Sequence, residues 1–176
     1  GLPTSSAADL DALMTALSRV HEARSSFREQ KELAGLTAPL ESSGSLVYDA
    51  PSHLEKHTAA PIEERIVVDG DWLTYTKPAD GTHYTMSLAK APELRGLVEA
   101  IRGTLAGDLD GLRRYYEVSM AGSAADWQLT LIPVDGRVEN VLASVRIDGR
   151  ATGLRQVETV EANGDVTRMT IEPAAP

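Results

Sequence analysis

The stretch that decides the fold reads SSGSLVYDAP at residues 42–51 and RIVVDGDWLTYTK at residues 65–77. In the second segment, two runs of β-branched and aromatic residues flank Asp69-Gly70. This pair favours a tight hairpin turn, because both central residues of such a turn need positive φ. The first segment predicts a short strand that begins at Gly44 and ends at Pro51, since proline cannot donate to a strand ladder. The stretch therefore predicts a strand followed by a β-hairpin.

The rest of the chain shows little alternation between helix and strand. Apolar residues at steps of three and four predict a helix over residues 6–23, a second from Pro92 to residue 105, and a short one over residues 108–116. Alternating apolar and polar residues predict further strands at residues 83–88, 126–133, 142–147, 154–161 and 166–172. Because strands mostly follow strands, we expect an α+β fold with a curled antiparallel sheet whose concave face is covered by helices.

Length and composition exclude several classes of protein. A chain of 176 residues favours a single domain over residues 1–176. The absence of cysteine excludes a disulfide scaffold, thiol catalysis and cysteine-bound zinc. A net charge of −9 without a stripe of Lys and Arg disfavours nucleic acid as a partner. The sequence contains no run of about 18 apolar residues, so it predicts no membrane-spanning helix.

No motif in the chain predicts catalysis. His53 and His57 have a spacing that could hold a metal on a helix, but they follow a proline in a segment expected to be loop or strand. The pair Glu63-Glu64 stands next to Arg65 and is typical of a solvated turn. The Gly-x-Ser-x-Gly motif of a nucleophile elbow is absent. We therefore expect no catalytic residue, no metal and no cofactor.

The order of these elements resembles the LolA-like family of periplasmic lipoprotein carriers. The resemblance rests on the strand from Gly44 to Pro51, on residues 67–75 (VVDGDWLTY), and on Phe27-x-x-Gln30 after the first helix. It makes residues 25–33 a strand, although their own pattern is ambiguous between helix and strand. The family fold is an incomplete antiparallel barrel closed by a lid of helices, with a cavity that holds acyl chains.

The resemblance also implies a function. It predicts a non-enzymatic periplasmic carrier, with its signal peptide removed, that takes the acyl chains of a lipoprotein or lipid from an inner-membrane donor complex to an outer-membrane acceptor. The prototype carrier has an Arg before the strand-ending Pro, and this Arg holds the lid closed. Here the position is Ala50, and Lys56 stands near the place of a frequent Trp. We therefore expect a divergent branch, in which packing holds the lid more than hydrogen bonds do.

Apolar residues on the predicted strand and helix faces are the candidates for the cavity wall. Carried onto this sequence, the predicted hydrophobic cavity is lined by Leu46, Tyr48, Leu54, Ile66, Val68, Leu73, Tyr75, Met86, Leu97, Ile101 and Leu129. The alternative is that these residues form an ordinary filled core, and that the protein is a non-enzymatic interaction module of the cell envelope. A cavity lowers stability because its wall loses dispersion contacts, which a bound acyl chain would restore.

Overall fold

The computed structural model describes residues 1–174. Within these residues, eleven strands form one antiparallel sheet. The strands are β1 (Glu22–Glu32), β2 (Leu40–Asp49), β3 (His53–Ala60), β4 (Glu64–Asp69), β5 (Trp72–Lys77), β6 (Thr82–Ser87), β7 (Tyr116–Gly122), β8 (Trp127–Pro133), β9 (Leu142–Arg150), β10 (Gly153–Glu161) and β11 (Val166–Pro173). Their order across the sheet is β6-β5-β4-β3-β2-β1-β11-β10-β9-β8-β7. The sheet is not closed, and β6 and β7 form its edges, which confirms the expected antiparallel α+β fold.

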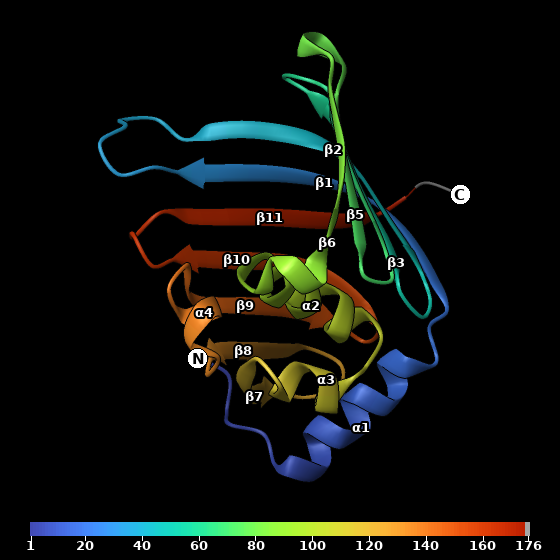
Figure 1. Ribbon diagram of the computed structural model, residues 1–176. Helices are drawn as coiled ribbons and strands as arrows, with labels where there is room; N and C mark the ends of the chain where they lie inside the picture. The colour runs from blue at the N-terminus through green and yellow to red at the C-terminus, as the bar shows by residue number, and fades with distance from the viewer. Residues whose placement is uncertain (175–176) are drawn as a thin grey trace.

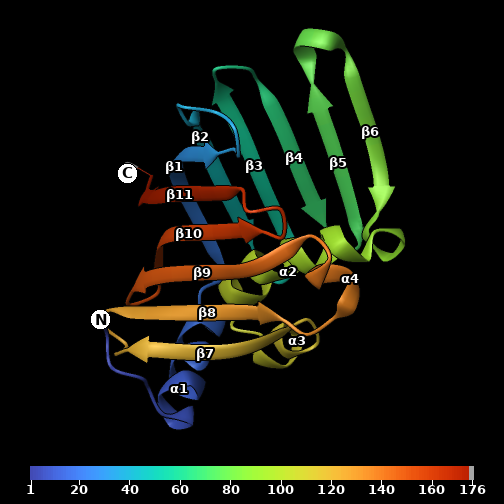
Figure 2. The same ribbon diagram turned by 90° about the vertical axis from the view of Figure 1, so that its left-hand side faces the viewer.

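The sheet curls, and the helices lie within the curl. In Figure 2, β3 to β6 run upright while β7 to β11 run across, so the two halves of the sheet face different directions. Figure 1 shows α2 crossing the inner face, with α1 and α3 below it. The helices are α1 (Ala7–Ser18), α2 (Pro92–Leu105), α3 (Leu109–Arg113) and α4 (Gly136–Glu139), with 3₁₀ turns at Pro78–Asp80 and Leu88–Lys90. Among these residues, no helix has both the length and the hydropathy to cross a membrane.

The first helix begins where its capping residues place it. The Ser6 hydroxyl accepts a hydrogen bond from the Asp9 amide at 3.1 Å, and the Asp9 carboxylate accepts one from the Ser6 amide at 3.0 Å. This capping box satisfies two amides that the helix itself leaves free. The helix ends at Ser18 instead of residue 23, because the chain must enter β1 at Glu22.

One predicted boundary in the deciding stretch was wrong. The strand β2 begins at Leu40, so Gly44 lies inside the strand instead of opening it. The polar span after Pro51, which was expected to be loop or strand, contains β3. In β3, Leu54 faces inward, but the next inward position is Lys56. The apolar alternation that marks a half-buried strand is therefore missing from this segment.

Two further boundaries differ in the middle of the chain. The predicted helix over residues 108–116 ends at Arg113, and Tyr116 already begins β7. The predicted turn at Asp135-Gly136 opens the short helix α4, whose first amides donate to the Asp135 side chain. Residues 25–33 fall in β1 apart from Leu33, as the family resemblance predicts.

The buried apolar residues form two separate clusters. The larger one lies between α1, α3 and the half of the sheet that consists of β1, β11, β10, β9, β8 and β7. It includes Trp127, Leu129 and Ile147. The smaller one consists of Val68, Leu73 and Leu88 beside β4 and β5. One helix contacts both, since α2 packs Leu97, Ile101 and Leu105 on the larger cluster and Leu94 and Val98 on the smaller one.

The strands β2 and β3 approach each other closely at Gly44. The pairing of these strands shifts register between Ser43 and Gly44, where the ladder is irregular. A Cβ atom at Gly44 would collide with the carbonyl oxygen of His57 and lie 2.9 Å from the Cα of Thr58. Phe27 lies opposite Gly44 on β1. Only glycine therefore fits at this close approach of β2 and β3.

We expect Gly44→Ala to lower the free energy of unfolding by about 3 kcal/mol, because the added methyl group meets backbone atoms that cannot move aside. Chemical denaturation measures this loss. Gly136→Ala is the matched control, since a Cβ atom there has no neighbour within 4 Å. Equal stability of the two variants would show that position 44 does not require glycine.

Candidate functional site

An apolar hollow lies between α2 and the concave face of the sheet, at the seam between the two core clusters. It has two lobes, which share Leu54, Lys56, Ile101 and Met169. The first lobe, of about 340 Å³, lies between the end of α1, the last turns of α2, and β1, β2, β10 and β11. The second lobe, of about 310 Å³, lies under α2 toward β3, β4 and β5. Each volume is at the lower end of the range of roughly 300–1,000 Å³ that is typical of ligand sites.

The hollow gathers eight of the eleven residues predicted for the cavity. Leu46 and Tyr48 line the first lobe, and Leu54 and Ile101 line both lobes. The second lobe adds Ile66, Val68, Leu73 and Leu97.

The other three predicted residues lie elsewhere. Leu129 is fully buried in the larger cluster, where neighbouring side chains surround it. Met86 and Tyr75 pack beside the smaller cluster on the β5–β6 hairpin, and the Tyr75 ring stacks on Tyr84 with 5.3 Å between ring centroids. None of the three lines the hollow.

Sequence reasoning missed the part of the wall that comes from the ends of the chain. Leu17 and Val20 close the first lobe from α1 and the residues after it. Val157 and Met169 face the hollow from β10 and β11. The alternation in these strands gave the right signal, because it predicts an inward apolar face, but nothing in it indicates that the face borders a hollow.

A buried arginine ties α2 to the sheet. Arg102 is 6% exposed, and its Nη1 donates to the carbonyl oxygens of Ser52 at 2.9 Å and Gly70 at 2.7 Å. Its Nε donates to the Glu99 carboxylate one turn earlier in the helix, at 2.8 Å. The two carbonyls belong to the β2–β3 and β4–β5 turns, so one side chain holds the helix to both.

The hydrogen bonds of Arg102 correct the expectation, drawn from Ala50, that packing holds the helix more than hydrogen bonds do. The absence of an arginine before Pro51 predicted a helix held mainly by packing, yet the helix supplies an arginine of its own. A buried guanidinium is costly unless its donors are satisfied, and here a carboxylate and two carbonyls satisfy it. The polarity is the reverse of the one that the family prototype implies, because the donor is on the helix and the acceptors are in the turns.

A second contact fixes the other side of α2. Gly96 and Gly103 lie against Val138 and Leu112, where a Cβ atom would come within 3 Å of side-chain carbons. The absence of side chains lets α2 approach α3 and α4 closely. The Tyr116 hydroxyl donates to the Gly96 carbonyl at 2.6 Å, and burial raises the pKa of this phenol. The helix is therefore docked along one side, while its apolar stripe faces the hollow.

The two histidines with metal-like spacing contact separate carboxylates. His53 and His57 lie on β3, on the face opposite Leu54. The Nε2 atom of His53 is 2.8 Å from Glu55, and that of His57 is 3.2 Å from Glu63. Within residues 1–174, no three potential ligands gather into a metal-binding group.

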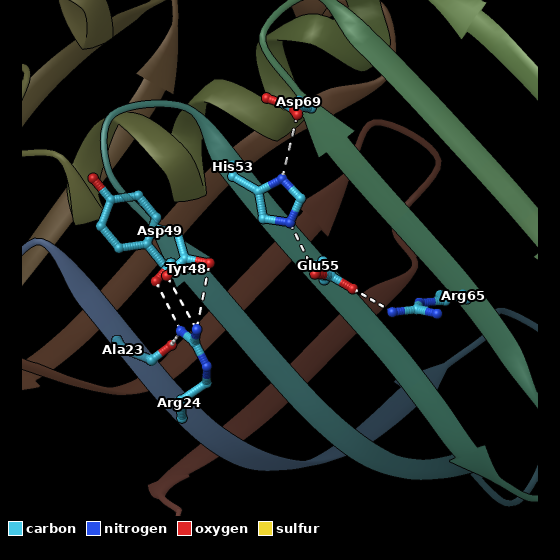
Figure 3. A network of polar contacts seen from close by, with 8 residues as sticks. All are labelled: Ala23, Arg24, Tyr48, Asp49, His53, Glu55, Arg65 and Asp69. Carbon is cyan, nitrogen blue, oxygen red and sulfur yellow. Dashed lines mark hydrogen bonds and ion pairs between the residues drawn. The ribbon is translucent and has the colours of Figure 1, made fainter.

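The His53 side chain lies between two carboxylates, those of Glu55 and Asp69, which Figure 3 shows as dashed contacts. The hydrogen bond with Glu55 raises the pKa of His53, and the charges of Glu55 and Asp69 add to this against the opposing effect of burial. A raised pKa means that protonated His53 stabilises the fold. This stabilisation is fully present below the unfolded-state pKa of about 6.5 and is lost as the pH rises through the higher folded-state value.

We expect His53→Gln to lower the melting temperature at about pH 5.5 more than at about pH 8.5, because only the protonated imidazole interacts with both carboxylates as a cation. Thermal unfolding of both proteins across this range tests the prediction. A difference in melting temperature that does not change with pH would contradict it.

Comparison with solved structures finds related folds of low sequence identity. A LolA superfamily protein from Nitrosomonas europaea matches with a TM-score of 0.47 and 10% identity, over 96% of this chain and 95% of that one. The MucA/MucB complex of Pseudomonas aeruginosa matches at 0.44 and 12%, over 95% and 56%. The complex of the CwlD amidase and the GerS lipoprotein from Clostridioides difficile matches at 0.41 and 12%, over 91% and 89%.

Comparison with sequences gives the family. No curated protein matches the chain. The sequence profile described as "Outer membrane lipoprotein carrier protein LolA-like" matches residues 3–176, which is nearly the whole chain. The chain belongs to this LolA-like family.

Proposed function

We propose that this protein is a non-enzymatic carrier that binds the acyl chains of a lipoprotein or lipid in the hollow under α2. It would work in the periplasm as one domain over residues 1–176, taking its cargo from an inner-membrane donor and passing it to an outer-membrane acceptor. The observation that supports this most is the hollow itself. Its wall consists largely of aliphatic side chains, and Leu54 and Ile101, which border both lobes, are partly exposed.

The energetics of the hollow favour an apolar chain as ligand. Each buried CH₂ group contributes roughly 0.8 kcal/mol, so a long acyl chain could contribute on the order of 10 kcal/mol before the costs of ordering it. The wall residues would regain the dispersion contacts that the two separate clusters leave unmade. The two lobes meet at Leu54 and Ile101, so one chain could pass through both.

Loading would require a shift between a closed and an open position of α2. The helix carries the hollow-facing residues Leu97 and Ile101, so its displacement would widen both lobes. The closed position is held by Arg102, and a partner that competes for the Ser52 and Gly70 carbonyls would favour opening. Binding and release would then follow from the different affinity of the two states for the cargo.

One observation favours a second candidate function, an envelope interaction module. Trp72 and Tyr84, on the edge hairpin of β5 and β6, are 58% and 47% exposed, and large exposed aromatic residues are enriched at protein interfaces. In such a module the hollow would have no ligand. Binding of an acyl probe by the native protein distinguishes the two functions.

We expect Leu54→Trp to weaken binding of a fluorescent fatty-acyl probe at least tenfold, because the indole would fill the junction of the two lobes. Fluorescence titration measures the affinity. Ile132→Trp is the control, since Ile132 is 42% exposed on β8 and lies outside the hollow. Equal affinities of the two variants would contradict this site, and no binding by the unmodified protein would favour the interaction module.

We expect Arg102→Met to increase amide hydrogen exchange in α2 by about 10- to 100-fold, because hydrogen bonds from a charged donor contribute about 1.5–3 kcal/mol. Hydrogen exchange with mass spectrometry measures the effect. The matched control is Arg95→Met on the same helix. The Arg95 side chain forms an ion pair with the exposed carboxylate of Asp71, and such pairs contribute little. If both variants exchange alike, Arg102 does not hold the helix.

A further inference from the structure

The hydroxyl of Tyr48 is buried without a hydrogen-bond partner. Tyr48 lies on β2, is 2% exposed and lines the first lobe of the hollow. Among residues 1–174 its oxygen is one of two buried side-chain polar atoms that have no partner. Buried tyrosine hydroxyls usually find a partner, since an unsatisfied one costs about 1–3 kcal/mol. A phenylalanine would pack equally well here without this cost.

The Tyr48 side chain is directed toward the helices. In Figure 3, the ring of Tyr48 extends away from the Arg24–Asp49 contact and toward the helices. Burial raises the pKa of Tyr48, and the nearby charge of Arg102 opposes this, so the phenol remains a neutral O–H donor. Arg102 itself is bonded to Glu99, Ser52 and Gly70.

The charges around the first lobe limit the kind of group that Tyr48 could bind. The two cationic residues in its wall are both paired: Arg24 with Asp49 at 3.1 Å, and Lys56 with Glu29 at 2.6 Å. A free carboxylate that entered the lobe would lose its hydration without gaining an unpaired cation, which is unfavourable. An uncharged carbonyl oxygen loses much less hydration free energy, and a hydrogen bond from a phenol compensates for that loss.

We propose that the Tyr48 hydroxyl donates a hydrogen bond to an ester or amide carbonyl of the bound ligand, and that the hollow therefore selects acyl esters and amides over free fatty acids and hydrocarbons. This inference rests on the proposed function, because it requires an acyl chain in the hollow. It makes Tyr48 a specificity-determining residue and assigns the first lobe to the carbonyl end of the chain. The remaining chain would lie toward Ile101 and the second lobe.

The test compares matched C16 probes by their displacement of a fluorescent acyl reporter from the full chain. We expect the unmodified protein to bind methyl palmitate more tightly than palmitate or hexadecane. Tyr48→Phe should weaken methyl palmitate binding about five- to tenfold, the effect of one neutral hydrogen bond, and leave hexadecane binding unchanged. Its melting temperature without ligand should not fall, because the variant loses no hydrogen bond of the free protein.

Tyr84→Phe is the control, since Tyr84 is exposed and lies outside the hollow. If all probes bind but Tyr48→Phe weakens none of them, or weakens all equally, the inference is overturned while the carrier function stands. If no probe displaces the reporter from the unmodified protein, the carrier function fails first. A triacylated lipopeptide and a diacylglycerol, tested in the same way, distinguish a lipoprotein from a lipid as the source of the carbonyl.

Discussion

The width of the curled sheet, relative to α2, the helix that contacts both of its halves, determines the rest of the structure. The strands β3 to β6 run in a different direction from β7 to β11, and α2 lies in the angle between the two halves (Figure 2). One helix contacts both halves but cannot fill the space between them. The core therefore divides into two clusters, and the hollow remains at their seam. A flatter sheet would let the helix close the gap, as in an ordinary layered α+β protein.

The attachment of α2 follows from the same geometry. On the side toward α3 and α4 its small residues allow close packing, whereas on the side toward the hollow its long aliphatic residues are only partly buried. Arg102 adds a polar attachment by reaching the turns of the upright half of the sheet. The Arg102 hydrogen bonds are therefore located beside the part of the structure where apolar packing is incomplete.

The sequence predicted which side chains face inward better than it predicted whether they border the hollow or a filled core. Alternation correctly placed Leu46 and Leu73 on the inner face, but the same alternation placed Leu129 there, and this residue lies in a filled core. Periodicity identifies a face, while the distance to the opposite layer depends on the curl. The segment of β3 could be predicted only as loop or strand, because Lys56 occupies an inward position, where its ammonium group contacts Glu29 and the Phe27 ring. Arg102 left no sequence signal, since its main partners are backbone carbonyls of turns distant in the chain.

The direction of the Arg102 hydrogen bonds determines which residues they constrain. Here both acceptors outside the helix are peptide carbonyls, which every residue provides. The turns at Ser52 and Gly70 can therefore vary in side chain as long as their backbone conformation is kept, and only Arg102 and its partner Glu99 are chemically fixed. The absence of an arginine before Pro51 therefore leaves α2 attached to the sheet, because the helix supplies a donor of its own.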